Sequence, residues 1–582
     1  MNVKTRLPPE HEFIEIRCTS LTAPKKLVYE DELLHVPLKP AVESLLNQMP
    51  LNRHPSIDRH HHFSVLILGM KSVSHQSFIR HMPRSFNYLR KKMGAVPFHG
   101  FQSIGSEMRD NIFALLSGLR LSEIRSTCLS DSNNFDDCPF IWKEYARLGY
   151  RTSYAEDAIP YSIFNGPGLK GFSKEPFDYD LRTLTASTKG GLKVGHDVRN
   201  NLTFECHGSK LIFETLLDNL VKTAYTLREK PYWHMTWSNL LTVNVNEYAK
   251  FGDRPLVSAL KTLKRQKLLS QTVLFILSDH GMSFGKLRAT TEQGFFEERL
   301  PILYAVMPES FKRRFPKAMR NFVENSRGKL ITPFDVHATM KQLISLPIPQ
   351  LPVNPLSTPM SSAVDEVSSE LRRNFSSTSS PPSQPIPFNI KLETKFNRFV
   401  TNNSVRSLFH EMSRARTCES IGVDEGYCAC LNRTDVAIES KQVEEVGNFV
   451  VHSMNKKLKA HRYCSVLTLG AIKTVKTFHA KRSDKESMRN DINTKDASGN
   501  GRRTKMAKKS LDYLPIKVLE IRFQTSPGNI EWYATVRFHR RTKSMTVGQL
   551  IRINAPTLSV GCTKIPEIFE FCYCQPLANN LP

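Results

Sequence analysis

The chain has 582 residues, of which 40% are hydrophobic, so it is long enough for several domains and too apolar to be disordered throughout. Its formal net charge of +26 indicates anionic partners such as nucleic acid, acidic glycans or membrane headgroups, although much of the surplus lies in segments that look unfolded. Met1 is followed by polar sequence and no run of about 20 apolar residues occurs, so the sequence predicts neither a signal peptide nor a membrane span.

Residues 1–60 are expected to form an irregular leader. The apolar run "FSVLILG" that follows predicts a buried strand, and "SFIRHMPRSFNYLRKKMG" predicts a helix that stops at Gly94. A second helix and strand are expected in "DDCPFIWKEYARLGYRTSYAED", and a third pair in "PLVSALKTLKRQKLL" and "TVLFILS". Strands that alternate with helices predict an α/β layered domain with a largely parallel central sheet over residues 61–346.

The composition changes after residue 346. Residues 347–394 are rich in serine and proline, which predicts a disordered linker. Residues 395–582 are expected to form a smaller, cysteine-stapled α+β C-terminal region that is interrupted by a basic mobile loop at about 475–510. Within it, "IKVLEIRFQTS" and "EWYATVRFHRR" alternate like two antiparallel strands joined by a turn at Pro527 to Asn529.

Six cysteines cluster late in the chain, in two segments that share one cysteine, a gap and then a C-x-C pair. This spacing is tighter than the usual zinc pattern, so we expect disulfides, with a zinc site as the alternative. Cys18 or Cys206 could join them. The disulfide candidates are Cys418, Cys428, Cys430, Cys562, Cys572 and Cys574.

Four N-x-S/T sequences mark candidate glycosylation sites at Asn201, Asn374, Asn402 and Asn432. Such sequences also occur by chance at about this frequency in a polar chain. Together with the cysteines they predict an extracellular protein, or one in the lumen of the secretory pathway, whose signal or anchor is missing from this sequence.

The strand "TVLFILS" ends on Asp279 and His280, with Gly281 as the bend that follows. Chemistry in an open α/β sheet sits at the carboxyl ends of the strands. A carboxylate and a neutral imidazole are suitable ligands for zinc or a similar ion. The alternative interpretation is that Asp279 caps the next segment while His280 packs against it.

Several stretches occur in a fixed order from about residue 12 to residue 576. They include "VLILGMKSVSHQSFIRHMPRSFNYL", "FIWKEYARLGYRTSYAEDAIPYSIFN", "LFILSDHG", "EQGFFEERLP", "PFDVHAT", "RTCESIGVDEGYCAC" and the final "CYC". In this set the chain resembles the animal sulfatase-like family of uncharacterised extracellular proteins, within the alkaline phosphatase and sulfatase superfamily. The resemblance implies a metal ligand where the first strand ends in Gly-Ile-Asp, and a threonine nucleophile in Gly-x-Asn-Thr-x-Pro-Asn. It also implies a His-Asp pair after a tryptophan-containing strand and a closing Ser-Asp-His-Gly, which together support metal-assisted attack on a phosphate or sulfate ester.

The sequence departs from this pattern at the decisive positions. Lys71 stands where the ligand aspartate is expected, and Met108 stands where the threonine is expected. Val243 and Asn244 replace the His-Asp pair, which leaves Asp279 and His280 as the remnant of the metal site. Since zinc sites usually have three or four protein ligands, the sequence predicts a degenerate site without a cofactor. Lys71 can then replace the cation, and zinc, manganese or calcium would be bound only if the site were functional.

Other residues at family positions are expected to have structural roles. We interpret Asp157 and Arg182 as structural or cleft groups, and His337 as a hydrogen-bonded histidine at a helix start that could otherwise reach the cleft. Glu297, Glu298 and Arg299 are expected to form an ion-pair turn before a strand.

The leading hypothesis is a secreted or lumenal pseudoenzyme that binds an anionic phosphate- or sulfate-bearing ligand, a glycan or a partner protein. The alternative is an active, rearranged ester hydrolase in which a serine replaces the threonine and Glu107 replaces the lost acid. The serine candidates are Ser72, Ser74 and Ser106. A third hypothesis, a basic nucleic-acid-binding protein, lacks any recognisable binding motif, so no nucleic acid is expected.

Overall fold

The structure is a computed structural model and describes most of the two folded regions. No helix within the described part of the chain is both long and apolar enough to cross a bilayer. The residues that it describes are 11–21, 26–49, 62–129, 134–157, 162–166, 169–181, 193–197, 202–207, 209–242, 246–283, 285, 287–288, 291–346, 405–423, 427–430, 432–438, 440–479, 516–539, 542, 544–553 and 571–575.

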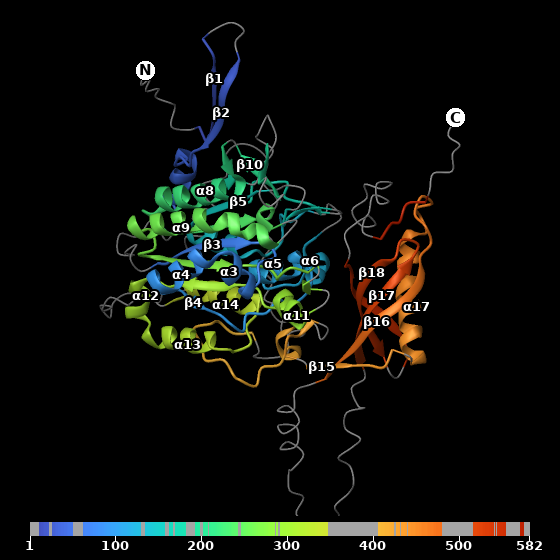
Figure 1. Cartoon of the computed structure of the whole chain (residues 1–582). Helices are drawn as coiled ribbons and strands as arrows, with labels where there is room; N and C mark the ends of the chain where they lie inside the picture. Colours follow the sequence, from blue (N-terminus) through green and yellow to red (C-terminus); the bar gives the residue numbers. More distant parts are fainter. Residues whose placement is uncertain are drawn as a thin grey trace, which may run out of the picture.

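A mixed sheet forms the centre of the first region (Figure 1). Its described strands run in the order β4-β14-β13-β3-β12-β5-β8, and all pairs from β13 to β8 are parallel. Only β14 runs against its neighbours. The predicted α/β class with a largely parallel sheet is therefore confirmed. The strands are β3 (Ser64–Met70), β4 (Val96–Pro97), β5 (Arg151–Glu156), β8 (Tyr179–Leu181), β12 (Tyr232–Ser238), β13 (Thr272–Leu277) and β14 (Leu303–Val306).

Helices cover both faces of this sheet, which explains why its central strands are apolar without alternation. Along β3, Val65 and Ile67 join one core cluster, whereas Leu66 and Leu68 join the other. The first cluster includes α5 (Met108–Ser117), α7 (Ile141–Leu148), α13 (Pro316–Ser326) and α14 (Pro333–Ile344). The second includes α3 (His75–His81), α4 (Pro83–Lys92), α8 (Ile212–Leu227) and α9 (Ala249–Arg265).

Shorter elements complete this region. They are α6 (Leu121–Thr127), α11 (Glu292–Arg299), α12 (Glu309–Arg314), β6 (Asn165–Gly166), β7 (Leu169–Lys170), β9 (Lys193–Asp197), β10 (Leu202–His207), β11 (Lys210–Leu211) and the 3-10 turns η2 (Leu240–Thr242), η3 (Asn246–Tyr248) and η4 (Glu419–Ile421).

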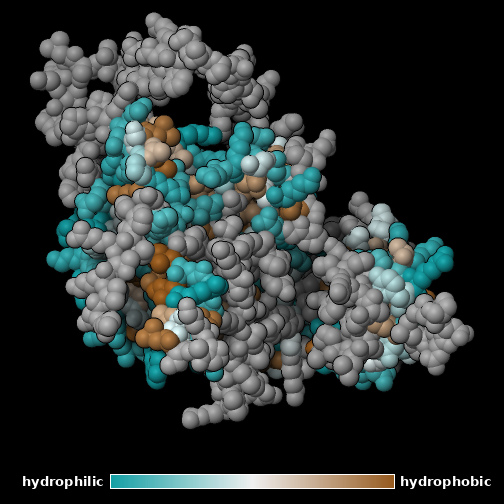
Figure 2. All heavy atoms as spheres, turned by 90° about the horizontal axis from the view of Figure 1, so that it is seen from above, coloured by the Kyte–Doolittle hydropathy of each residue, from teal (hydrophilic) through white to brown (hydrophobic). Residues whose placement is uncertain are grey.

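The expectation of an irregular leader is wrong for its described part. A β-hairpin of β1 (Phe13–Thr19) and β2 (Leu27–Leu34) precedes helix α1 (Pro40–Asn47). Glu43 holds α1 on the sheet, because it accepts bonds from the buried Arg151 guanidinium, with Nε to Oε1 at 2.6 Å, and from the Tyr179 hydroxyl at 3.1 Å. The hairpin projects from the domain in Figure 1. The view from above shows brown hydrophobic patches among mostly teal residues (Figure 2).

The C-terminal region is an antiparallel sheet in the described order β15-β16-β17-β18-β19, with helix α17 (Lys441–Leu458) packed against it. The predicted strand pair is confirmed as β17 and β18. The predicted basic loop starts too early, since β16 continues to His479, and the rest of that loop lies outside the described residues. The strands are β15 (Asn432–Asp435), β16 (Thr468–His479), β17 (Ile516–Ser526), β18 (Ile530–His539) and β19 (Met545–Arg552).

Residues 405–423 pack on the first region and not on the C-terminal sheet. Leu408, Phe409 and Met412 belong to the core cluster around α5, and Asn325 Nδ2 donates to Leu408 O at 3.0 Å. The linker assigned to residues 347–394 lies outside the described residues. The segment after it therefore completes the α/β core before the chain enters the C-terminal sheet.

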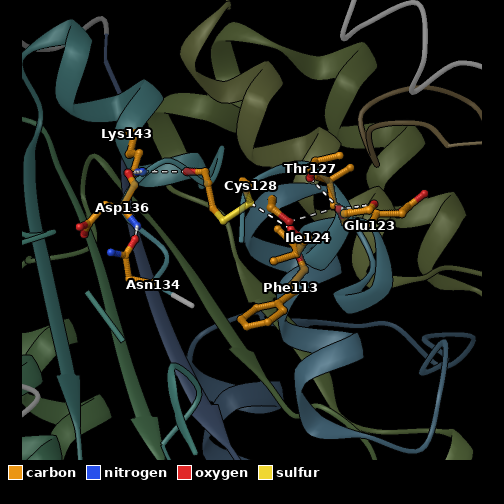
Figure 3. Close-up of a disulfide and its surroundings, with 12 residues drawn as sticks. Phe113, Glu123, Ile124, Thr127, Cys128, Asn134, Asp136 and Lys143 are labelled. Atoms are coloured by element: carbon orange, nitrogen blue, oxygen red, sulfur yellow. Dashed lines mark hydrogen bonds between the residues drawn. A yellow bond between two sulfur atoms is a disulfide. The ribbon is translucent and has the colours of Figure 1, made fainter. Parts of the chain in front are cut away.

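The described residues contain three disulfides, namely Cys128–Cys138, Cys418–Cys428 and Cys464–Cys572. Figure 3 shows the first, beside Lys143, whose ammonium donates to Asp136 O and, at 2.8 Å, to Cys138 O. Each ten-residue loop stabilises the fold by about 2–3 kcal/mol through the entropy of the unfolded chain. The disulfide prediction is confirmed for four of the named candidates, Cys418, Cys428, Cys572 and Cys574. It missed Cys128, Cys138 and Cys464.

The remaining predicted modification sites are only partly described. Cys574 is also disulfide-bonded, whereas Cys18 and Cys206 take no part in the three bridges. Asn432 lies at the start of β15. The positions outside the described residues are Cys562, Asn201, Asn374 and Asn402.

Candidate functional site

The carboxyl edge of the central sheet brings Asp279 and His280 beside the end of β3. Asp279 is 1% exposed, and its Oδ1 accepts bonds from the Ser72 N–H at 2.8 Å and the Ser278 hydroxyl at 3.1 Å. Its Oδ2 accepts no hydrogen bond and lies 3.2 Å from His280 Nε2. His280 Nδ1 lies 2.5 Å from Gly281 O and so carries a proton, because a carbonyl oxygen can only accept. Asp279 Oδ2 and His280 Nε2 therefore face each other at the carboxyl edge of the sheet.

The turn after β3 places Lys71 level with this pair. In the parallel register Gly69 lies opposite Leu277, so Lys71 and Asp279 follow at the same level. The Lys71 N–H donates to Ser238 O at 2.9 Å, and Lys71 O accepts a bond from the Thr242 hydroxyl. The backbone of a lysine is thus fixed at the tip of the first strand, where the resemblance implies a carboxylate.

Ser72 carries the strain of this turn. Its φ of 59° lies in the left-handed region, which costs a residue other than glycine about 1 kcal/mol or more. The conformation aims the Ser72 N–H at Asp279. Asp279 is therefore a cap, as the alternative interpretation held, but it caps the turn after β3 and not the segment after itself.

Met108 is the first residue of α5 and is 8% exposed. The loop before it keeps its shape through Asn111, whose Oδ1 accepts from the Ile104 N–H at 2.7 Å and whose Nδ2 donates to Gly105 O and Glu107 O, both at 2.9 Å. Our sequence interpretation overlooked Asn111, although it occupies the final position of the Gly-x-Asn-Thr-x-Pro-Asn pattern. The loop survives as a scaffold, yet the thioether at its end has no proton to lose and cannot act as an activated hydroxyl.

Two adjacent buried carboxylates join the ends of β5 and β12. Asp157 accepts from the Ser238 hydroxyl at 2.8 Å, the Asn239 N–H at 2.8 Å, the Leu240 N–H at 3.1 Å and Asn239 Nδ2 at 3.3 Å. Burial raises the pKa of Asp157 above its usual range. Four donors leave this carboxylate no free capacity for a ligand, which supports the structural interpretation.

Glu156 is bonded in a similar way. It accepts bonds from the Ser162 hydroxyl at 2.8 Å, the Ile163 N–H at 2.9 Å, Asn239 Nδ2 at 2.9 Å and the Tyr154 hydroxyl at 3.0 Å. Burial raises the pKa of Glu156 to about 7, and these bonds oppose the shift only in part. The sequence interpretation missed Glu156, because an acid next to Asp157 carries no distinguishing pattern.

The serines proposed as substitute nucleophiles differ in their surroundings. Ser74 is committed to the fold, since its hydroxyl accepts from the Ser77 N–H at 2.9 Å and donates to Glu297 Oε2 at 2.8 Å. Arg80 pairs with the same Glu297 carboxylate at 2.6 Å. Ser72 is buried at the strand end, whereas Ser106 is half-buried in the loop before α5 and Glu107 beside it is exposed. Ser72 is therefore the one candidate serine that lies directly beside Asp279.

The remaining predicted positions lie apart from the pair. His337 is buried, its Nδ1 lies 3.1 Å from Leu115 O, and burial lowers its pKa to about 4, as expected for a structural histidine. Glu298 and Arg299 pair at 2.8 Å, and Arg299 also lies 3.8 Å from Glu520 of β17. They form a buried contact with the C-terminal sheet and not only a turn. Arg182, Val243 and Asn244 lie outside the described residues.

These residues do not fit a divalent ion. Asp279 and His280 offer two donor atoms, and the described part of the chain brings no third histidine, cysteine or carboxylate to them. The one group of three such side chains found among the described residues is Cys418, Cys428 and Cys430, whose sulfur atoms lie within 4.8 Å of one another. Because Cys418 and Cys428 share a disulfide, they cannot serve as thiolate ligands in this state.

Comparison with known proteins identifies a family but no described activity. Residues 1–473 match a family described as a protein of unknown function, DUF229. No curated protein matches the chain.

Several solved structures are similar. A Bacteroides thetaiotaomicron protein, described with a core genetic locus for metabolism of multiple glycosaminoglycans, is 12% identical over 52% of this chain and 82% of its own, with a TM-score of 0.34. A Vibrio parahaemolyticus protein in the alkaline phosphatase superfamily is 15% identical over 43% of this chain and 60% of its own, with a TM-score of 0.31. The integral membrane lipooligosaccharide phosphoethanolamine transferase A of Neisseria meningitidis is 10% identical over 48% of this chain and 54% of its own, with a TM-score of 0.34.

Proposed function

The chain belongs to the DUF229 family of proteins of unknown function, and we propose that it is a pseudoenzyme of the sulfatase and alkaline phosphatase type. In this proposal it binds an anionic phosphate- or sulfate-bearing group at the carboxyl edge of the sheet and does not hydrolyse it. The observation that carries the proposal is Met108, a buried thioether on an intact loop where the chemistry requires a hydroxyl.

The charges at this edge support binding without catalysis. Lys71 brings a positively charged side chain to the strand position level with Asp279, where the resemblance implies a metal ligand. An ammonium can hold a phosphate or sulfate oxygen, but it cannot lower the pKa of a hydroxyl as strongly as a divalent ion does. Glu156 and Asp157 are both occupied by hydrogen bonds and are not available as general bases.

We further propose that the protein works outside the cytosol, in the extracellular space or the secretory lumen. The support is chemical: disulfides form and persist in oxidising compartments, and three occur among the described residues. Glycosylation at the four asparagines named above belongs to the same proposal. Mass spectrometry of the protein secreted from animal cells tests it, since intact thiols at Cys128 and Cys138 would contradict it.

The decisive experiment measures ester hydrolysis by the full chain. Purified protein is incubated with aryl phosphate and aryl sulfate esters in the presence of zinc, manganese or calcium. We expect the parent chain to show no more turnover than the Asp279→Ala variant. Elemental analysis should find less than about 0.1 equivalent of divalent metal per chain. Turnover that Asp279→Ala abolishes and Glu107→Ala preserves would show an active enzyme.

An active hydrolase with a rearranged site is the second candidate, and one observation favours it. Ser72 has a strained positive φ directly after a buried strand and before a helix, as nucleophilic serines of strand–turn–helix sites do. However, neither nitrogen of His280 is bonded to its hydroxyl, because Nδ1 faces Gly281 O and Nε2 faces Asp279. An activity that Ser72→Ala removes and Ser106→Ala retains would establish this candidate.

A further inference from the structure

Helices α4 and α9 lie parallel and are joined at both ends. At the N-terminal end of α4, Asp253 of α9 accepts from the Arg84 N–H at 3.1 Å, the Ser85 N–H at 2.8 Å and the Ser85 hydroxyl at 2.7 Å. At the other end, Lys264 Nζ donates to Lys92 O. The two C-terminal ends are therefore held next to each other.

These ends lie at the amino edge of the sheet, opposite the candidate site. Six residues connect the end of α9 to the first residue of β13, whereas Asp279 lies two residues after its last residue. Helix α12 joins the same edge, because it follows the antiparallel β14 and its Ser310 hydroxyl donates to Ser270 O at 3.0 Å. The three helices can be followed in the left part of Figure 1, away from the C-terminal sheet.

Cations accumulate here without matching acids. Residues 83–95 and 254–271 contain no aspartate or glutamate. On α12, the Glu309 carboxylate already pairs with the Lys312 ammonium at 2.6 Å, and Arg313, which follows Lys312, is exposed. We use the term basic surface for the exposed residues Arg90, Lys91, Lys92, Lys264, Arg265 and Lys267.

Helix dipoles do not account for this charge. Cations at a helix C-terminus are favourable because the end carries about half a negative charge. The negative ends of two helix dipoles neutralise roughly one unit of positive charge, whereas the basic surface holds six unit charges. The excess repels itself at a cost to stability, which an anionic partner would relieve.

We propose that the basic surface binds a linear sulfated polysaccharide. Cations held on two parallel helix ends match a partner that carries closely spaced fixed anions. A membrane is less suitable, because none of the exposed large hydrophobic side chains among the described residues belongs to α4, α9 or α12, so nothing at this surface can insert between lipids. The choice of a polysaccharide over nucleic acid rests on the proposed location outside the cytosol.

Heparin is the probe for the test. The full chain is compared with the variant Lys91→Gln/Lys92→Gln/Arg265→Gln/Lys267→Gln. Each exposed ion pair contributes about 0.5 kcal/mol, so we expect the affinity for heparin at 0.15 M NaCl to fall about 30-fold, with elution from a heparin column at lower salt. The matched control Lys441→Gln/Lys456→Gln/Lys459→Gln/Lys473→Gln removes the same charge from exposed residues of the C-terminal region. Its affinity for heparin should fall by less than about threefold.

Two results would overturn the proposal. One is an equal loss of heparin affinity in both quadruple variants, which would show a diffuse charge effect. The other is retention of the parent chain by phosphatidylserine vesicles or duplex DNA but not by heparin at the same salt. Ester turnover by the parent chain would overturn the pseudoenzyme proposal alone, so the two proposals fail separately.

Discussion

The two edges of the central sheet use charge in opposite ways. At the carboxyl edge, Asp157, Glu156 and Asp279 are buried and their oxygens accept bonds from the turns around them. At the amino edge, the basic surface is exposed, and residues 83–95 and 254–271, which carry it, contain no aspartate or glutamate. The buried acids of the carboxyl edge hold its turns together, whereas the cations of the amino edge face solvent, at the surface for which we propose a polysaccharide partner.

Among the variants of the two edges, removal of the Asp157 carboxylate should change the stability of the protein most. Asp157→Ala removes the acceptor of four hydrogen bonds and leaves three buried donors without any acceptor, namely the Ser238 hydroxyl and the N–H groups of Asn239 and Leu240. We therefore expect the free energy of unfolding to fall by about 3–5 kcal/mol. Urea unfolding of the full chain measures this loss. The control Glu107→Ala, at an exposed position of the same edge, should change stability by less than about 0.5 kcal/mol. Comparable losses in both variants would mean that the bonds to Asp157 are not what holds β5 to β12.

Glu156 should make the stability of the protein depend on pH. Its pKa is raised to about 7 from an ordinary value of 4.5, so folding favours its protonated form. The stabilisation is complete below pH 4.5 and is lost as the pH rises through 7, by up to about 3 kcal/mol. Glu156→Gln should remove this slope. Thermal unfolding between pH 5 and pH 8 provides the measurement, and an unchanged slope in the variant would assign the pH dependence to other groups.

Restoring a carboxylate at the tip of β3 should return some metal binding to the carboxyl edge. Lys71→Asp adds an acid level with Asp279 and removes the ammonium. At a manganese or zinc concentration about tenfold above its Kd, bound ion should stabilise the variant by about 1.4 kcal/mol, which shifts the Tm by a few degrees. Lys71→Asn, which removes the ammonium without adding a carboxylate, should show no shift. A metal-dependent shift in the parent chain would instead reveal a ligand set complete without Lys71→Asp.

The smallest effect is expected at the amino edge, with the opposite sign. The Lys91→Gln/Lys92→Gln/Arg265→Gln/Lys267→Gln variant relieves repulsion, so its stability should rise by up to about 1 kcal/mol in 20 mM salt. The gain should disappear in roughly 0.3 M salt, where exposed charges are screened. Urea unfolding at both salt concentrations measures it, and a loss of stability at low salt would mean that these cations have internal partners.

The sequence predicted the central fold where burial leaves a strong signal. The runs that became β3 and β13 are apolar throughout because helices cover both of their faces. The β1–β2 hairpin was missed because its strands carry charges such as Arg17 and Glu30 and no Asn-Gly or Asp-Gly turn joins them. The Cys128–Cys138 disulfide was missed although it repeats the ten-residue separation of Cys418 and Cys428.

The site was only partly predictable from the sequence. The family resemblance identified Lys71, Met108 and Asp279 as positions of the expected site. The sequence could not show which acids are fully hydrogen-bonded within the fold. Asp157 and Glu156 both accept bonds from Asn239, about 80 positions away, and only the register of β5 and β12 brings these residues together. The basic surface was overlooked for a similar reason, since its two halves are far apart along the chain and meet only where α4 and α9 are joined.

Arg299 is fully buried and is neutralised from two sides, by Glu298 next to it and by Glu520 of the C-terminal sheet, while Arg288 stacks on Tyr533 of the same sheet at 4.3 Å. None of the three described disulfides links the sheet to the α/β region. A protease that cuts between residues 346 and 405 would thus produce two polypeptides that these buried contacts hold together, with none of the three described disulfides joining them. They would run as separate bands on a denaturing gel and as one particle in native chromatography.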